Sequence, residues 1–198
     1  MLRCGPAAWA GLCCLLALLT LLGWGRDPGA IDWQPARAAS QPWRAWTAVA
    51  VHYSGLHLAA NLAGAVLVGA LGVAARVGPR EVIALLIAWP LTQAGLSVQP
   101  ALAHYGGLSG VLHAAVAVVG VHLLAQSTPA RRRIGAALLG GLLLKVLVEA
   151  PWGAPLRHPE GWDIAVAPLA HASGALAGLL AAKVLRLLLC RPAAGTPS

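Results

Sequence analysis

Six apolar segments, each close to the length that crosses a bilayer, occupy most of this chain. They cover residues 6–24, 46–73, 81–98, 108–126, 134–150 and 164–189 of the 198. A membrane-spanning helix needs about 20 predominantly apolar residues, because the hydrocarbon core is about 30 Å thick. Charged residues make up 10% of the chain, against about 25% in soluble domains. The pattern predicts an all-α membrane protein with six transmembrane helices in one domain, residues 1–198.

The charges of the connecting segments predict how these helices are oriented. Basic residues gather between the second and third segments, between the fourth and fifth, and near both chain ends: Arg3, Arg76, Arg80, Arg131, Arg132, Arg133, Lys183, Arg186 and Arg191. Cytoplasmic loops are enriched in Lys and Arg, so both termini are predicted to be cytoplasmic. The same distribution argues against nucleic-acid binding despite the net charge of +8. Segment 6–24 could be a signal peptide, but no small-residue cleavage site follows closely, which favours a retained helix.

Polar side chains inside apolar segments are costly in a bilayer and mark functional sites. In this chain they are His52, His57, Asn61, His113, His122, Lys145, Glu149 and His171. His57 and Asn61 are four residues apart and therefore share one helix face. Both could point at one ligand atom, or each could bond a neighbouring helix.

Two further motifs have a plain packing interpretation when each is taken alone. Ser109 is flanked by Gly107 and Gly110, which leave its hydroxyl and amide unobstructed, although Gly and Ser also favour helix packing. His171 precedes Gly174 and Gly178, whose spacing makes a flat face for another helix. Alone, such a histidine is a structural hydrogen-bonding group or a haem ligand.

The three motifs converge once the charge-based orientation is applied. Ser109 begins the fourth segment at its outward end, and His171 lies about eight residues below the outward start of the sixth. His57 and Asn61 fall at a similar depth in the second segment. The motifs are therefore predicted to meet near the outer face of the membrane.

In order and spacing the motifs resemble those of the rhomboid family. The matching positions of the second, fourth and sixth segments are Trp43, Arg44, Thr47, His52, His57, Asn61, Gly107, Ser109, Gly110, His171, Gly174 and Gly178. The resemblance implies a six-helix rhomboid bundle in a bacterial inner membrane, with an active site that opens to the outer face. Its activity would be intramembrane serine proteolysis, with membrane-anchored proteins as substrates and no cofactor or metal.

The chain is more narrowly similar to the rhombosortase branch. The features are its short six-segment length, residues 105–113, and the pair Lys145 and Glu149. That branch implies exported substrates with a C-terminal glycine-rich motif, an apolar helix and a basic tail. Glu149 would receive that tail, or would simply pair with Lys145 one helical turn away.

The resemblance also implies a role for each residue of the site. Ser109 is the expected nucleophile and His171 its base, and the oxyanion is expected on His57, Asn61 and the Ser109 amide. No acid is expected at the depth of His171, so a dyad is predicted rather than a triad. Gly107 and Gly110 support the serine, and residues 99–107 are a candidate gate.

Two more histidines have supporting roles in this scheme. His52 is expected to brace the first outward loop. His113 stands where many rhomboids have a tyrosine, and it either packs on the His171 ring or helps to set the tautomer of that ring.

Four other functions remain as alternatives. A catalytically inactive rhomboid-like chaperone or binding protein would share the fold. A cytochrome could use His57 and His171 as haem ligands, but it leaves the residues around Ser109 unexplained. A zinc protease lacks its HExxH motif, and a transporter lacks an evident inverted repeat.

Overall fold

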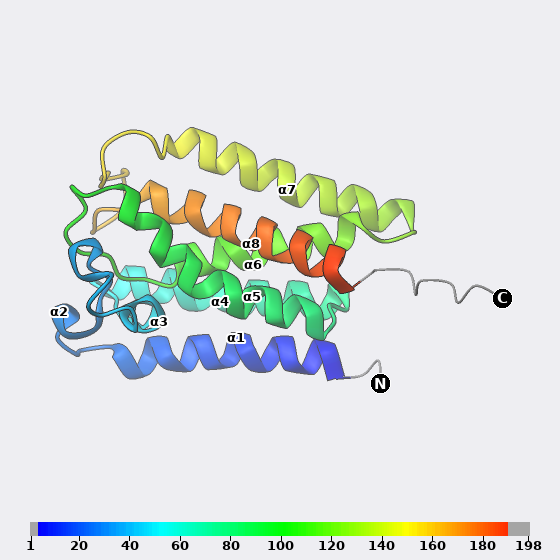
Figure 1. The fold of residues 1–198 in the computed structure, drawn as a ribbon, viewed down its shortest axis with the longest axis horizontal. Helices are drawn as coiled ribbons and strands as arrows, with labels where there is room; N and C mark the ends of the chain where they lie inside the picture. The colour runs from blue at the N-terminus through cyan, green and yellow to red at the C-terminus, as the bar shows by residue number, and fades with distance from the viewer. Residues whose placement is uncertain (1–3, 190–198) are drawn as a thin grey trace.

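Six long helices run roughly parallel or antiparallel to one another in the computed structural model, which describes residues 4–189 (Figure 1). They are α1 (Cys4–Gly23), α4 (Gly55–Ala75), α5 (Pro79–Ala94), α6 (Ser109–Leu124), α7 (Pro129–Glu149) and α8 (Pro168–Leu189). Short helices join them: α2 (Pro28–Ile31), η1 (Pro35–Arg37), α3 (Arg44–Thr47), η2 (Ala48–Ala50) and η3 (Gly95–Val98). The all-helical prediction is confirmed for these residues.

Four stretches are long and apolar enough to cross a membrane. They are Gly5–Gly23, Gly55–Ala75, Pro79–Val98 and Pro168–Leu189. Helix α6 is apolar but shorter, with 16 residues, and α7 carries three arginines, a lysine and a glutamate. A multi-pass membrane protein is therefore established, whereas the count of six spanning helices and the single domain over 1–198 stay predictions.

Helix α6 lies at the centre of the bundle and contacts α4, α5, α7 and α8. Its closest neighbour is α8, because glycines bring the two backbones together. A Cβ added to Gly174 would come within 1.9 Å of the Gly110 carbonyl oxygen, and one added to Gly178 within 2.3 Å of the Ala114 oxygen. The flat glycine face predicted for the sixth segment therefore receives α6.

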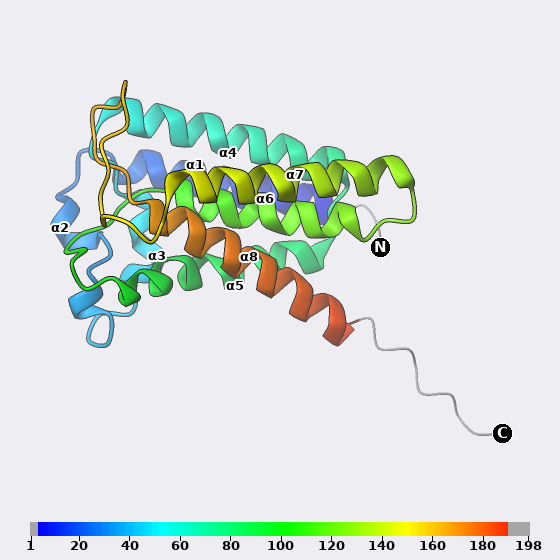
Figure 2. The same ribbon diagram turned by 90° about the horizontal axis from the view of Figure 1, so that it is seen from above.

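Helix α1 packs on α4 at the edge of the bundle in Figure 1, and in the view of Figure 2 it lies behind α6 and α7. The buried Trp9 indole donates a 3.1 Å hydrogen bond to the Val68 carbonyl. It occupies the space beside Gly72, where a Cβ would lie 2.1 Å from the indole nitrogen.

The helices alternate in direction, so one end of the bundle collects the starts of α4, α6 and α8 together with α2, α3 and the longer loops (Figure 1). The start of α1 and the end of α8 lie at the opposite end. Two basic residues used to predict orientation, Arg3 and Arg191, lie outside the described residues.

Three predicted segment boundaries were wrong. The second segment, 46–73, is not one helix: residues 44–50 form α3 and η2, and α4 begins only at Gly55. Ser54 is extended, with φ −154° and ψ 162°, and its hydroxyl caps α4 by accepting from the His57 amide. The apolar residues Ala48 and Val49 are fully buried inside the protein, so their apolarity did not indicate a lipid-facing span.

The starts of the fifth and sixth helices also differ from the prediction: α7 begins earlier than expected and α8 begins later. Helix α7 begins at Pro129, earlier than the predicted residue 134, and includes the three arginines that were assigned to a loop. A proline at the first helical position suits this start, because its missing N–H has no partner to lose there. Helix α8 begins at Pro168 rather than 164, because Val166 pairs with Arg157 in an antiparallel bridge.

Candidate active site

A cavity of about 720 Å³ opens at the end of the bundle where α4, α6 and α8 begin. Three helices contribute the polar groups predicted from sequence. These lining residues are His57 and Asn61 of α4, Ser109 and His113 of α6, and His171 of α8. Apolar side chains, among them Leu112, Val148 and Leu156, complete much of the wall. The three sequence motifs therefore meet in one cavity.

Ser109 and His171 share a hydrogen bond inside this cavity. The distance between Ser109 Oγ and His171 Nε2 is 3.0 Å. Ser109 is the first residue of α6 and His171 the fourth of α8, so His171 lies nearer its helix start than predicted. The Gly110–Gly174 contact lies next to Ser109 and sets how closely the two helices approach.

The other ring nitrogen of His171 contacts a carboxylate. His171 Nδ1 lies 2.7 Å from Glu149 Oε2, and the second oxygen, Oε1, accepts a hydrogen bond from Lys145 Nζ. The expectation that no acid reaches this depth was wrong. Helix α7 extends to Glu149 at the end of the bundle where α8 begins.

His113 stacks on His171. The ring centroids are 4.1 Å apart and the planes differ by 10°. His113 Nδ1 donates to the Ser109 carbonyl at 2.7 Å, one turn earlier on α6. Two roles are predicted for His113, packing on the His171 ring and setting the tautomer of that ring. The structure shows the packing contact.

Gly107 opens the space between the serine and α4. Its φ is +133°, a conformation that only glycine adopts readily. A Cβ at this position would lie 2.7 Å from His57 Nε2 and 3.8 Å from Asn61 Nδ2. Ser109 is the first residue of α6, so its amide has no acceptor within the helix. Two backbone or amide N–H groups and His57 Nε2, which can carry a proton, thus border one small space.

His52 contacts Asn61, and its expected role in bracing the loop before it stays a prediction. Asn61 Nδ2 lies 3.0 Å from His52 Nε2, and His52 is buried, with 7% of its surface exposed. Burial lowers the pKa of His52 to about 4. At neutral pH the uncharged ring can therefore accept one amide hydrogen of Asn61 and leave the other free.

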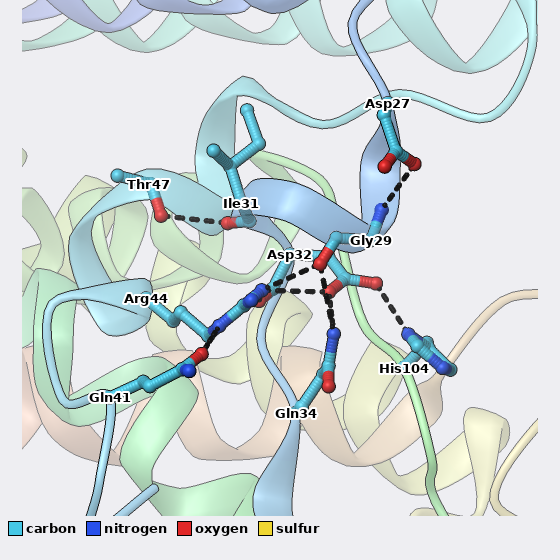
Figure 3. A network of polar contacts seen from close by, with 9 residues as sticks. All are labelled: Asp27, Gly29, Ile31, Asp32, Gln34, Gln41, Arg44, Thr47 and His104. Atoms are coloured by element: carbon cyan, nitrogen blue, oxygen red, sulfur yellow. Dashed lines mark hydrogen bonds and ion pairs between the residues drawn. The ribbon is translucent and has the colours of Figure 1, made fainter. Parts of the chain in front are cut away.

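A buried ion pair fixes the loop that precedes Ser109 (Figure 3). Arg44 Nη1 lies 3.3 Å from Asp32 Oδ1, and the other carboxylate oxygen, Asp32 Oδ2, lies 2.7 Å from His104 Nδ1. Arg44 also donates to the Gly29 and Asp32 carbonyls, and Gln41 accepts from its Nε.

The backbone of the same loop is tied down as well. Trp33 and Tyr105 exchange two 2.8 Å backbone hydrogen bonds, and the Gly107 amide donates to the Ala48 carbonyl at 2.9 Å. The loop 99–107, predicted as a gate, is held in place at its end nearest the serine.

The loop 150–167 forms part of the cavity wall and is held at two places. Arg157 donates to the Glu149 carbonyl at 2.7 Å and pairs with Val166 across an antiparallel bridge. Ser54, at the start of α4, donates to Asp163 Oδ1 at 2.7 Å. This loop bridges α7, α8 and α4 above the serine.

Among the described residues, one group has ligand atoms close enough for a metal: His113, Glu149 and His171, within 4.8 Å of one another. The two imidazoles are stacked nearly parallel. Nitrogen lone pairs lie in the ring plane, so one ion about 2.0–2.1 Å from each nitrogen cannot lie in both planes. The arrangement suits a histidine pair better than a metal centre.

Two tyrosines beside the serine were not found from sequence. Tyr105 is buried, which raises its pKa to about 12 and keeps its phenol protonated. Tyr53 stacks on His57, with centroids 6.4 Å apart and planes 12° apart. Tyr105 lies between two predicted apolar segments, whereas Tyr53 lies inside the predicted segment 46–73. Tyrosine is common where membrane helices meet water, so neither residue stands out as an unusual polar group.

The fold and the cavity define a multi-pass helical membrane protein in which a serine and a histidine from two helices share a hydrogen bond. The family model of the Rhomboid domain matches residues 39–187. The chain belongs to the rhomboid family, whose members are intramembrane serine proteases. The predicted family is thereby confirmed, and the match begins after α1. Comparison with curated proteins finds no match.

Proposed function

We propose that this protein is an intramembrane serine endopeptidase with Ser109 as nucleophile and His171 as general base. The observation that carries the proposal is the 3.0 Å contact between Ser109 Oγ and His171 Nε2 within the cavity. A nucleophile and a base within hydrogen-bond reach are the geometric signature of covalent catalysis.

The proposed reaction has two steps. Ser109 Oγ attacks the carbonyl carbon of a peptide bond while His171 Nε2 takes the hydroxyl proton, which it then gives to the leaving amine. Water then attacks the acyl-enzyme ester, again with His171 as base, and Ser109 is regenerated.

The Ser109 amide, His57 and Asn61 are the proposed donors to the oxyanion of both tetrahedral intermediates. Support comes from the N–H groups that border the space above Gly107. The loss of one such donor typically costs about 10²–10³ in rate.

The proposed substrates are membrane-anchored exported proteins with a C-terminal glycine-rich motif, an apolar helix and a basic tail. The resemblance to the rhombosortase branch supports this choice. The site itself gives no support to Glu149 as the receptor for the tail, because both of its carboxylate oxygens have partners within the protein. In this proposal the cavity opens to the outer face of a bacterial inner membrane, with both termini cytoplasmic.

Active-site labelling tests the proposal. Detergent-purified wild type, Ser109→Ala and His171→Ala would be treated with a fluorescent fluorophosphonate, which reacts covalently with an activated serine. We expect labelling of the wild type and none of either variant. Ser173→Ala is a matched serine control, because the Ser173 hydroxyl donates to the Thr92 carbonyl on the α5 side of α8.

Two results would contradict the proposal. Equal labelling of wild type and Ser109→Ala would place the reactive group elsewhere. An unlabelled wild type that also fails to cleave a membrane-anchored substrate in liposomes would favour a binding protein without catalytic activity.

A further inference from the structure

We infer that Glu149 is a positioning residue for His171, so that the site works as a Ser109–His171–Glu149 triad and not as a serine–histidine dyad. This inference rests on the proposed function and concerns how the same site operates. It starts from the 2.7 Å contact between Glu149 Oε2 and His171 Nδ1.

The Glu149 carboxylate is held from both sides. Lys145, one turn earlier on α7, donates to Oε1, while His171 occupies Oε2. The backbone is fixed as well: α7 ends at Glu149, Ala150 follows in the left-handed conformation with φ 49°, and Arg157 donates to the Glu149 carbonyl. A carboxylate held in this way gives His171 a fixed partner.

This partner sets the tautomer of His171. An ionised carboxylate can only accept hydrogen bonds, so the nitrogen that faces it, Nδ1, carries the proton. The lone pair then lies on Nε2, which is the nitrogen that faces Ser109 Oγ. The same ring orientation that satisfies Glu149 therefore presents the base to the nucleophile.

The carboxylate also compensates the charge that develops during the reaction. When Nε2 takes the serine proton, the ring becomes an imidazolium between the neutral stacking partner His113 and the Glu149 carboxylate. Nδ1 keeps its own proton throughout, and Glu149 remains ionised.

The titratable groups around His171 come from three other helices. His113 of α6 stacks on the ring, His57 of α4 lines the opposite side of the cavity, and Lys145 and Glu149 belong to α7. Within residues 4–189, Glu149 supplies the carboxylate that contacts His171. Its removal would leave Lys145 as an uncompensated cation nearby.

Kinetics of Glu149→Gln and Glu149→Asp on a membrane-anchored substrate test the inference. Glutamine keeps the shape but removes the charge. We expect kcat to fall by about 10²–10⁴-fold, as for loss of the orienting acid in a serine triad, with little change in KM. Aspartate, shorter by one methylene, should restore part of kcat.

The pH profile separates positioning from a merely structural role. Without the carboxylate the imidazolium loses its counter-charge, and Lys145 disfavours it further. The acid limb of the Glu149→Gln profile should therefore move to lower pH while the plateau falls. Glu160→Gln is the matched control, because Glu160 is an exposed acid in loop 150–167 outside the cavity lining, and it should match the wild type in rate and profile.

A spectroscopic measurement avoids dependence on turnover. Nitrogen-15 histidine spectra of Ser109→Ala should assign the Nδ1–H tautomer to His171, with a low-field Nδ1 proton. That signal should disappear in Ser109→Ala/Glu149→Gln while thermal unfolding stays cooperative.

The outcomes separate this inference from the proposed function. A wild type that labels and cleaves, together with a Glu149→Gln variant of equal kcat and unchanged pH profile, would overturn the role of Glu149 alone. The Nε2–H tautomer in Ser109→Ala would also overturn it. Absence of labelling and cleavage in the wild type would overturn the proposed function.

Discussion

Gly107 shows how one residue without a side chain can define a catalytic space. Its φ of +133° turns the chain from the loop tied to Trp33 into the start of α6. Its missing Cβ leaves room for His57 Nε2, which would otherwise be 2.7 Å away. The backbone conformation and the open space are separate requirements, and each can be tested.

We predict that Gly107→Ala abolishes fluorophosphonate labelling. The strained φ should also cost about 1–3 kcal/mol of stability. Gly25→Ala is the matched control: Gly25 has φ +78°, and a Cβ there meets nothing within 4 Å. Both variants should unfold at lower temperature, but only Gly107→Ala should lose labelling. Normal labelling of Gly107→Ala would show that the reaction of Ser109 with the probe does not depend on the present position of His57.

Much of the site at the residue scale could be predicted from sequence. Ser109 and His171 were identified because polar groups in apolar helices are rare and need partners. Glu149 stands out for the same reason, and its predicted pairing with Lys145 is confirmed, but its contact with His171 is not predicted by the sequence. Which face of α7 turns toward α8 depends on packing between helices, and a single apolar segment does not encode that rotation.

Among the elements, the pair α6 and α8 determines how Ser109 and His171 lie relative to each other. Their backbones touch at Gly110 and Gly174, beside the serine and the histidine. The Ser109–His171 distance therefore depends on helix spacing, which small residues set.

We predict that Gly174→Ala pushes α8 away from α6. The added Cβ would lie 1.9 Å from the Gly110 carbonyl oxygen, and overpacking of this kind costs about 1–3 kcal/mol. Labelling should slow and the midpoint of thermal unfolding should fall. Gly140→Ala, a glycine of α7 with nothing within 4 Å of its added Cβ, should change neither. Unimpaired labelling of Gly174→Ala would show that α6 and α8 can move apart without disturbing the contact between Ser109 and His171.

Element boundaries were the weakest part of the sequence prediction. Apolar content does not distinguish Val49, buried against other parts of the protein, from a side chain in lipid, so 46–73 was predicted as one span. The start of α4 depends on the Ser54 cap, a local hydrogen bond that hydropathy does not register.

For the whole molecule, the loop 150–167 lines the cavity and joins helices that lie far apart in sequence. The Ser54–Asp163 hydrogen bond joins this loop to the start of α4, 109 residues away in sequence. A large substrate has to displace the loop, whereas a small probe does not.

We predict that Asp163→Ala speeds cleavage of a membrane-anchored protein and leaves the labelling rate unchanged. A hydrogen bond of about 1 kcal/mol corresponds to a shift of about fivefold in loop opening. Glu160→Gln, in the same loop, should behave as wild type in both assays. Slower cleavage by Asp163→Ala would show instead that the closed loop helps to bind the substrate.

The close backbone contact between α6 and α8 has a consequence for how the membrane acts on this protein. Bilayers differ in thickness, and helices respond to mismatch by tilting. Ser109 and His171, the proposed nucleophile and base, lie on two helices whose backbones are in close contact, whereas α4 and α7 contact α6 from other sides. Lipid composition should therefore change how often a substrate enters the cavity, and leave unchanged how fast it reacts once it is there.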